Sequence, residues 1–334
     1  MDIRIKEPFT DQYALIVESD TKMVNVHLTS RTLMRWEFCV LNIDEYKIEA
    51  HLILLENKLL ECNNPIVKDV ASVSQIFSKI YGEIHVCVSH TGEVIDVLNK
   101  DSLKARWEEL KEDLLQSLDK EEIRDIIRLN DDIFSNPQRI KEVVQGNEFL
   151  TLFFYHIYGH SIPYKGGIRQ TNFFKTTMLD WAFSFTGTVL DQKHKNLVTI
   201  DVHGKPAFIL SRNFYSTAYA NFRNSLNIYS LSTKLREKAS YHIDTITGRL
   251  VESEILRQEI ADEENLFVET AYNLMNYDRY CEKTSIKAGI QGEDVDGRVL
   301  YRGVEYTKED WDKIQRNPWT EFSHKLQNPS KKDI

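Results

Sequence analysis

Hydrophobic and polar residues alternate along residues 12–62, and this pattern is typical of strands with one buried face. The alternation is clearest in VNVHL and IEAHL, and polar turns such as SDTK and NIDE interrupt it. Four segments rich in β-branched and aromatic residues result: QYALIVES, KMVNVHLTS, RWEFCVLNI and YKIEAHLILLE. Short turns join antiparallel strands, since a parallel pair needs a crossover of about a dozen residues or more. The first part of the chain therefore predicts an antiparallel meander.

The hydrophobic period lengthens after Asn64-Pro65, a pair typical of a helix start because Asn caps the helix and Pro fits its first turn. The spacing then predicts a helix over 65–81 that ends at Gly82, with one apolar face made of Ile66, Val70, Val73, Phe77 and Ile80. A hairpin about Thr91-Gly92 follows, over 83–98. It leads into an amphipathic helix whose apolar face carries Trp107.

Residues 101–158 keep a helical pattern, with a second Asn-Pro start at 136–137. From residue 160 the pattern is again that of strands: WAFSFTGTVLD, NLVTIDVHG, PAFILSRNF, KASYHIDTIT, GRLVESEILRQEI and ENLFVETAYNLMNYD. Residues 164–167, YKGG, are expected to form a flexible connection. Residues 214–238 fit either a helix or an irregular segment.

These elements predict an α+β fold: a large curved antiparallel sheet, or two sheets, with a helical insertion and a small C-terminal appendage. The expected parts are a β-meander with one helix and a hairpin (1–100), a helical segment (101–160), a second antiparallel β region (161–280) and a hairpin–helix tail (281–334). In the tail, the aromatic residues Trp311, Trp319 and Phe322 lie in a polar stretch. They are the expected contacts with a protein partner.

Composition argues against some classes of function for this chain. The sequence has 334 residues, 42% of them hydrophobic, and a net charge of −9. An acidic chain without a basic stripe repels phosphate backbones, so nucleic-acid binding is not expected. The N-terminus has no apolar segment typical of a signal peptide, and no apolar run reaches membrane-spanning length. The four cysteines are widely spaced, which also favours a bacterial-type cytoplasmic protein.

The segment DTITGRLVESEI at 244–255, which follows the strand KASYHI, resembles the TG hairpin of LolA/LolB-like curved-sheet proteins. The resemblance extends over 10–98 and 160–275 as a succession of strands with TG turns. It implies a wide antiparallel sheet around helices, whose apolar concavity binds lipids, lipoproteins or partner chains without catalysis. The sequence departs from those proteins because it lacks an export signal and a lipobox cysteine.

Candidate chemistry is sparse. His156 and His160 have the HxxxH spacing that places two imidazoles on one helical face, so a metal site is one interpretation. Packing beside the core and near the helix end is the other. Cys87 and His85 share a strand face, but a cysteine inside an apolar strand behaves as a small hydrophobe. No cofactor is predicted.

Three functions remain open. The first is a non-enzymatic adaptor or chaperone-type protein that binds a protein partner, in a bacterial secretion or toxin system. The second is a carrier of an apolar small molecule or lipid, in a sheet cavity lined by the strand-borne aromatics Trp36, Phe38, Trp181, Phe183 and Phe185. The third is a metal-dependent enzyme that uses His156 and His160.

Overall fold

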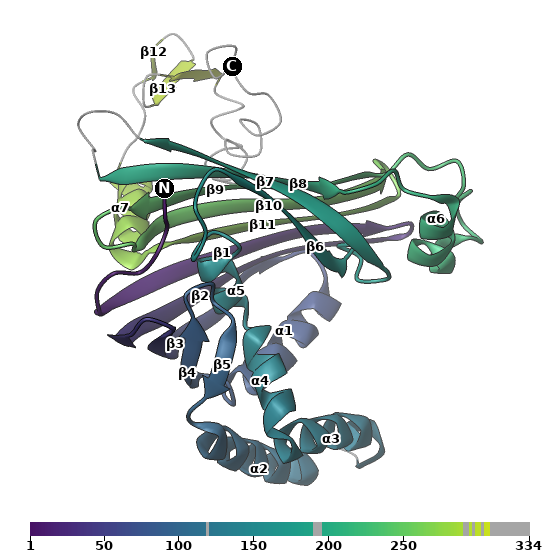
Figure 1. Ribbon diagram of the computed structural model, residues 1–334. Helices are drawn as coiled ribbons and strands as arrows, with labels where there is room; N and C mark the ends of the chain where they lie inside the picture. Colours follow the sequence, from purple (N-terminus) through teal and green to yellow (C-terminus); the bar gives the residue numbers. More distant parts are fainter. Residues whose placement is uncertain (118–119, 190–195, 290–293, 296–297, 302–303, 308–334) are drawn as a thin grey trace. The chain divides into compact units, whose positions relative to one another are not determined.

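The computed structural model describes residues 1–117, 120–189, 196–289, 294–295, 298–301 and 304–307 (Figure 1). The chain divides into two compact units, Met1–Tyr277 and Asp278–Ile334. Each unit is described by itself below.

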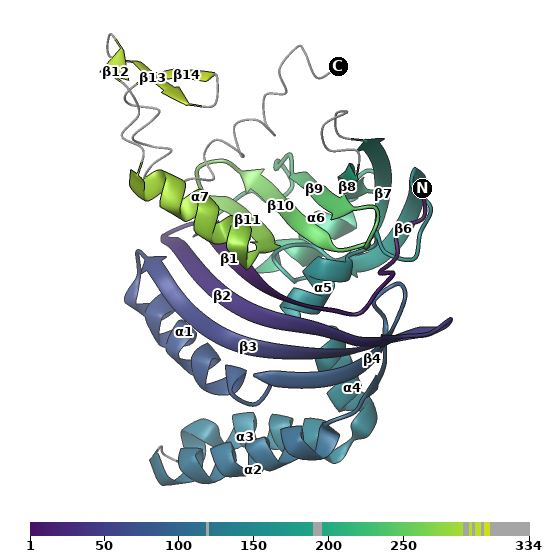
Figure 2. The ribbon, with the colours of Figure 1, turned by 90° about the vertical axis from the view of Figure 1, so that its left-hand side faces the viewer.

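One antiparallel sheet of 11 strands forms the frame of the first unit. In chain order the strands are β1 (Phe9–Met23), β2 (Val26–Ile43), β3 (Lys47–Cys62), β4 (Glu83–Ser89), β5 (Val94–Val97), β6 (Tyr164–Thr171), β7 (Met178–Val189), β8 (Leu197–Pro206), β9 (Lys234–Asp244), β10 (Leu250–Asp262) and β11 (Leu266–Asn276). Across the sheet their order is β5-β4-β3-β2-β1-β11-β10-β9-β8-β7-β6. The fold class predicted from sequence is confirmed. The two β regions share a single curved sheet (Figure 2), because β1 pairs with β11 over residues 13–23.

The helices of this unit are α1 (Pro65–Ser78), α2 (Lys100–Ser117), α3 (Lys120–Ser135), α4 (Pro137–Gln145), α5 (Glu148–Phe154) and α6 (Arg212–Ala218). Both Asn-Pro pairs start helices as expected, and the Asn64 side chain accepts a hydrogen bond from the Ile66 amide. The α2 and α3 helices lie side by side (Figures 1 and 2). Trp107 is fully buried between them, with its ring stacked 5.9 Å from that of Phe134.

The main core lies between the sheet and α5. Phe153 of α5 packs with its ring centroid 5.6 Å from Tyr13 of β1 and 4.8 Å from Phe38 of β2. Phe149 contacts the same two rings and also Trp36. Aromatic pairs at these separations add to the free energy gained by burying their area.

Local structure differs from the sequence-based expectation at five places. The expected turn SDTK lies within β1, and the chain turns instead at Val24-Asn25, inside the expected strand KMVNVHLTS, so that β2 continues from Val26 through RWEFCVLNI as one strand. The expected strand PAFILSRNF does not form, because β8 ends at Pro206 and α6 begins at Arg212.

Residues 164–167 are not a flexible connection but the start of strand β6, which pairs with β7 along its whole length. The helix expected to reach residue 158 ends at Phe154, because Tyr155 adopts φ +40° and turns the chain back toward the sheet. The first helix ends at Ser78 rather than 81, and the chain then turns so that the Gly82 carbonyl accepts from the Leu54 amide.

The open interpretation of residues 214–238 is also resolved. The segment contains most of α6, a 3-10 turn over Ala220–Phe222 and the start of β9.

The second unit contains most of α7 (Tyr277–Gly289) and a three-stranded antiparallel sheet of β12 (Asp294–Val295), β13 (Arg298–Tyr301) and β14 (Val304–Thr307). The hairpin expected here is thus part of a small sheet. The helix expected after residue 307, and with it Trp311, Trp319 and Phe322, lies outside the described residues.

Candidate functional site

The inner face of the sheet, the face on which α5 packs, carries side chains in rows that follow the strand register. One row consists of Thr32, Val17, Tyr272, Ile255, Ala239, Val202, Phe185 and Tyr164. The next consists of Ser30, Ser19, Thr270, Arg257, Glu237, Gly204, Phe183 and Gly166. Directly paired residues of an antiparallel sheet point to the same side, so these rows chart one continuous surface.

Part of this surface, the filled region, is covered by the chain's own aromatic residues. It includes the five predicted cavity residues, Trp36, Phe38, Trp181, Phe183 and Phe185, each at most 5% exposed. The ring of Phe183 lies over Gly204, where an added Cβ would come within 2.3 Å of it. Tyr155 stacks on Tyr241 with ring centroids 5.5 Å apart. The structure therefore places the predicted cavity residues in the packed core.

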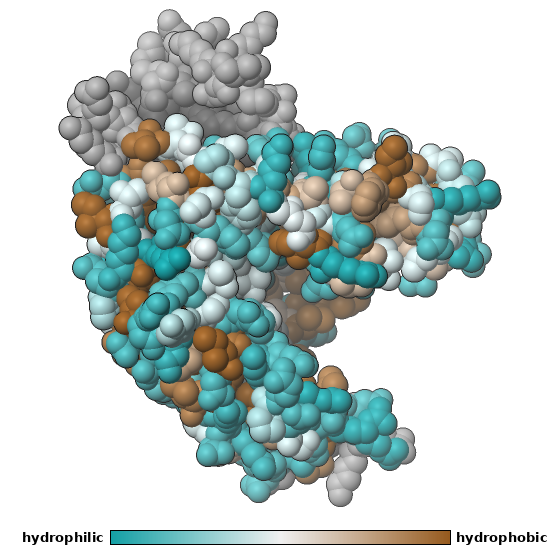
Figure 3. Space-filling model, in the orientation of Figure 1, coloured by the Kyte–Doolittle hydropathy of each residue, from teal (hydrophilic) through white to brown (hydrophobic). Residues whose placement is uncertain are grey.

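The open region of the inner face lies on β2, β1 and β11, at the start of both rows. Its side chains are only half-buried although they face into the curve of the sheet: Thr32, Val17, Tyr272, Ser30, Ser19 and Thr270. Figure 3 shows the surface hollowed between the end of the sheet next to α6 and the helical segment, with apolar side chains visible inside. The chain therefore leaves part of its inner face accessible.

An ion pair between a buried carboxylate and a partly exposed guanidinium borders the open region. Glu237 is 1% exposed, and its carboxylate accepts from Nε of Arg257 at 3.2 Å and from the hydroxyl of Tyr155. Burial is the largest single influence and lowers the pKa of the Arg257 guanidinium, but the charge and hydrogen bond of Glu237, together with Tyr272 and Tyr155, raise the pKa above its ordinary value. The same guanidinium lies 5.1 Å from the centroid of the Tyr272 ring. The pair thus fixes a cation beside an aromatic ring of the open region.

Two further titratable side chains stand on the α5 side. Glu148 and His156 are accessible to solvent, yet protein surrounds them on several sides, as in a concavity. This partial desolvation raises the carboxyl pKa of Glu148, while the charges of Arg257 and Lys175 lower it. It lowers the imidazole pKa of His156, which the charge of Glu237 partly offsets.

A second buried carboxylate, Glu259 of β10, is fully buried. It accepts from the amides of Phe173 and Phe174 at 2.7 and 3.1 Å and from the hydroxyl of Tyr219 at 2.8 Å. Burial raises its pKa despite these donors. Because the donors come from the β6–β7 turn and from the segment after α6, Glu259 fastens both to the sheet.

His156 and His160 do not share a helical face, since both follow the end of α5. The His160 ring stacks 4.7 Å from that of Tyr164, which stacks in turn on Phe185. Within the residues that the structure describes, no three His, Cys, Asp or Glu side chains gather closely enough to hold a metal ion. The metal interpretation therefore rests on spacing alone.

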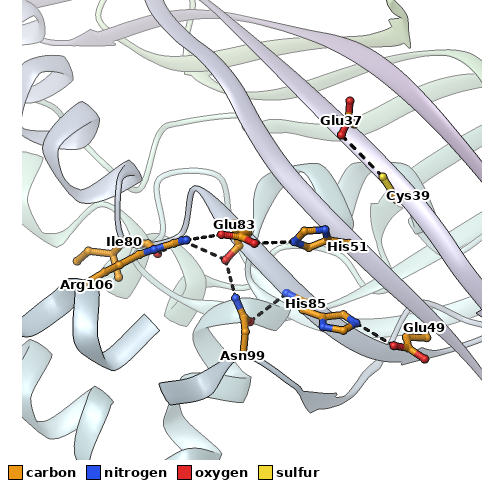
Figure 4. A network of polar contacts seen from close by, with 9 residues as sticks. All are labelled: Glu37, Cys39, Glu49, His51, Ile80, Glu83, His85, Asn99 and Arg106. Atoms are coloured by element: carbon orange, nitrogen blue, oxygen red, sulfur yellow. Dashed lines mark hydrogen bonds and ion pairs between the residues drawn. The ribbon is translucent and has the colours of Figure 1, made fainter. Parts of the chain in front are cut away.

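The opposite face of the sheet carries a separate polar network (Figure 4). His51 and His85 are paired across β3 and β4, with ring centroids 5.6 Å apart. Nε2 of His51 lies 3.1 Å from Glu83, and that of His85 lies 2.9 Å from Glu49. Arg106 of α2 also pairs with Glu83 and lowers the carboxyl pKa of that residue. This network ties α2 to the sheet.

Two cysteines, Cys39 and Cys87, lie on the same face of the sheet as this network. The Cys39 Sγ donates to Glu37 at 3.9 Å, and desolvation raises the thiol pKa of Cys87. A raised pKa disfavours the thiolate that nucleophilic catalysis requires. The arrangement is that of structural contacts.

Sequence reasoning missed Glu237, Arg257, Tyr272 and Glu148. For Glu237 and Arg257, the sequence contained one indication that they form a pair. A hairpin centred on Thr247 places residues 237 and 257 opposite each other, and the observed register pairs them. Two opposite charges on the inner face of adjacent strands would then have indicated a buried pair.

No protein-family model matches the sequence, and no curated protein matches it. A solved structure described as "Lipid-protein interactions in lipovitellin" is similar over 80% of this chain, with a TM-score of 0.37 and 8% identity. The aligned region spans about a quarter, 25%, of that chain. DynF from the dynemicin biosynthesis pathway of Micromonospora chersina aligns over 83% of this chain and 84% of its own, with a TM-score of 0.18 and 7% identity.

Among the described helices, none combines the length and the apolar character needed to cross a bilayer.

Proposed function

We propose that this chain is a non-enzymatic binding protein of the adaptor or chaperone type, whose protein partner docks on the open region of the inner face. The observation that carries the proposal is the partial exposure of Val17, Thr32 and Tyr272, which lie in the same row as fully buried side chains. Inner-face residues of a curved sheet are normally covered. An incomplete covering supports an external occupant.

The composition of the open region favours a protein occupant over a lipid. Ser19, Ser30, Thr32 and Thr270 supply hydroxyl groups, and Val17 and Tyr272 supply apolar area. Hydrocarbon cannot satisfy hydroxyl groups, whereas a polypeptide brings its own donors and acceptors. The carboxylate of Glu148 adds a negative charge beside these groups, since the charge of Arg257 is already paired with Glu237. A bacterial secretion or toxin system, as the setting of such an adaptor, belongs to the same proposal.

Site-specific photo-crosslinking tests this proposal. A photoreactive residue is placed at Thr32 or Thr270, and at Lys58 as a control, because Lys58 pairs with Leu33 and is exposed on the opposite face. The protein is illuminated in extract of its own cells. A discrete protein adduct from Thr32 and Thr270 but not from Lys58 is expected. Equal labelling from all three positions contradicts docking in the open region.

A carrier of an apolar ligand is the second candidate, favoured by the gathering of aromatic rings on the inner face. The resemblance of residues 244–255 to LolA/LolB-like proteins supports the same candidate. A ligand lined by Trp36, Phe38, Trp181, Phe183 and Phe185 has to displace α5, Tyr155 or Phe173. The first two contact four of these side chains, and Phe173 packs on Trp181. Native mass spectrometry of protein purified without detergent distinguishes the candidates, because a carrier retains a small apolar molecule.

The third candidate, a metal-dependent enzyme, has only the HxxxH spacing in its favour. Metal analysis of the purified wild-type protein and of the variant His156→Ala tests this candidate. A stoichiometric metal in the wild-type protein that is lost in the variant supports it.

A further inference from the structure

The 11-stranded sheet has two edge strands, β5 and β6. They differ in whether side chains from a helix bond to their outer backbone groups. The β5 edge is short and capped: Oε1 of Gln145 on α4 accepts from the Val94 amide at 2.5 Å, and its Nε2 donates to the Gly92 carbonyl at 3.4 Å. The free part of β3 beyond β4 is capped as well, because Nε2 of Gln75 on α1 donates to the Asn57 carbonyl at 3.1 Å. Such capping prevents unintended strand pairing.

The β6 edge is not capped in this way. The eight residues of β6 pair with β7 on one side, and no second strand of the described chain pairs with them on the other. Every alternate side chain, from Lys165 to Thr171, is exposed. An edge strand of this length presents a row of backbone donors and acceptors to an incoming strand.

The segment just before β6 already accepts such a strand. The amide of Ile3 donates to the His160 carbonyl at 3.2 Å, and the amide of Ile162 donates to the Met1 carbonyl at 2.8 Å. Asp2 and Ser161 form an antiparallel bridge between these bonds. Antiparallel pairing therefore occurs immediately ahead of β6 along the chain.

The packing of the described residues does not require glycine at Gly166 or Gly167, in the middle of β6. Neither has a positive φ, and a Cβ added to either would meet no atom closer than 3.4 Å. Glycine lowers the stability of a strand, and in strands it often marks a place where another backbone approaches closely. The pair is therefore consistent with an edge that receives a partner.

The charges on the outer face of β6 indicate which kind of strand could pair with this edge. Lys165 and Arg169 are exposed on the outer face of β6, which carries no acidic residue, and Lys205 lies two strands away on the same face. Asp180, opposite Arg169, is the acidic residue of the paired segment of β7. In a chain of net charge −9 this edge is a local basic site. A second copy of β6 would bring another Lys165 and Arg169 beside the first, and like charges at that distance repel.

We infer that β6 binds an extended, acidic peptide segment of a partner protein by strand addition, with acidic side chains at alternate positions beside Lys165 and Arg169. Main-chain hydrogen bonds supply affinity in this mode, and alternate side chains supply specificity. The site is distinct from the open region of the inner face, so it does not depend on the function proposed above.

The probe is a fluorescent eight-residue peptide, capped at both ends, with Glu at alternate positions and Thr or Val between them. Its binding to the full chain is followed by fluorescence anisotropy. We expect binding, with at least about tenfold loss for Lys165→Glu/Arg169→Glu, because two cross-strand charge pairs become repulsive. The control, Lys68→Glu/Lys104→Glu, makes the same change of net charge on exposed positions of α1 and α2 and is expected to bind normally. Equal loss in both variants contradicts a site at β6.

Backbone methylation separates strand addition from simple charge attraction. Two versions of the peptide carry N-methyl groups on one or the other alternate set of amides. A paired strand turns only one set toward β6, so one version should lose binding and the other should keep it. Equal binding of both versions overturns the inference. So does a dimer in analytical ultracentrifugation that Lys165→Glu/Arg169→Glu dissociates, since the occupant is then a second copy.

Discussion

The filled and open regions of the inner face belong to the same strands, yet they are built differently. In the filled region, Tyr13 and Phe38 lie under Phe149 and Phe153 of α5, and their rings pack against one another. In the open region, four residues further along β1, Val17 is half-buried and its row neighbours are Thr32 and Tyr272. The side chains change from aromatic to small and hydroxylated where α5 no longer covers the sheet.

The difference separates a region that stabilises the unit from a region whose side chains stay accessible. Stability comes from the filled region, because burial of large aromatic side chains is the main favourable contribution to folding. The open region is supported from one side by the Glu237–Arg257 pair, whose charges are satisfied within the protein. Substitutions in the two regions should therefore separate stability from binding.

The largest effect is expected from Phe153→Ala. The side chain is fully buried among Tyr13, Phe38 and Tyr158, so its removal leaves a cavity in the filled region. The free energy of unfolding should fall by about 4–5 kcal/mol, as measured by urea denaturation. Phe208→Ala is the matched control, because Phe208 is 76% exposed and its loss should cost little. Similar losses in both variants contradict the assignment of the core to this region.

A smaller loss, about 3 kcal/mol, is expected from Arg257→Met, because the Glu237 carboxylate then stays buried without its cation. The double variant Glu237→Gln/Arg257→Met removes both charges and should recover much of the loss. Denaturation of the four proteins of this double-mutant cycle measures the coupling. Additive effects of the two substitutions would show that the ion pair does not operate as a unit.

A pH-dependent effect, smaller than the first two, is expected at Glu259. Burial raises its pKa above the ordinary value of 4.5, so the unfolded chain releases this proton at lower pH than the folded one. The stability that Glu259 contributes is therefore fully present below pH 4.5 and is lost as the pH rises through the raised pKa. Glu259→Gln should remove this loss, so the wild-type advantage over the variant should shrink between pH 5 and pH 8. The exposed Glu263→Gln serves as the control.

The smallest effect on stability is expected in the open region. Thr32→Lys should change the free energy of unfolding by less than about 0.5 kcal/mol, since the long side chain can extend into solvent. The same variant should lose the protein adduct that a crosslinker at Thr270 captures. A stable variant that retains the adduct would place the partner elsewhere on the molecule.

Much of the architecture could be read from local patterns. Alternation over residues 12–62, the Asn-Pro helix starts and the Thr247-Gly248 turn act over a few residues, so they identify strands, helices and antiparallel pairing without knowledge of the rest of the chain. The same reasoning missed β6, because a Gly-Gly pair has little strand propensity and only pairing with β7 holds it extended. The helix over residues 149–158 was predicted too long for a similar reason: the turn at Tyr155 depends on packing against Tyr241.

The sequence by itself thus determined the α+β class, the antiparallel connections and a sparse set of candidate catalytic residues. Only the tertiary structure decided that both β regions form one sheet, that the aromatics of β2 and β7 are core, and that Thr32, Val17 and Tyr272 stay accessible beside them. The pairing of β1 with β11 joins residues more than 240 positions apart in sequence. Local propensity carries no information over such separations, because these contacts are selected by the burial of a common core and not by neighbouring residues.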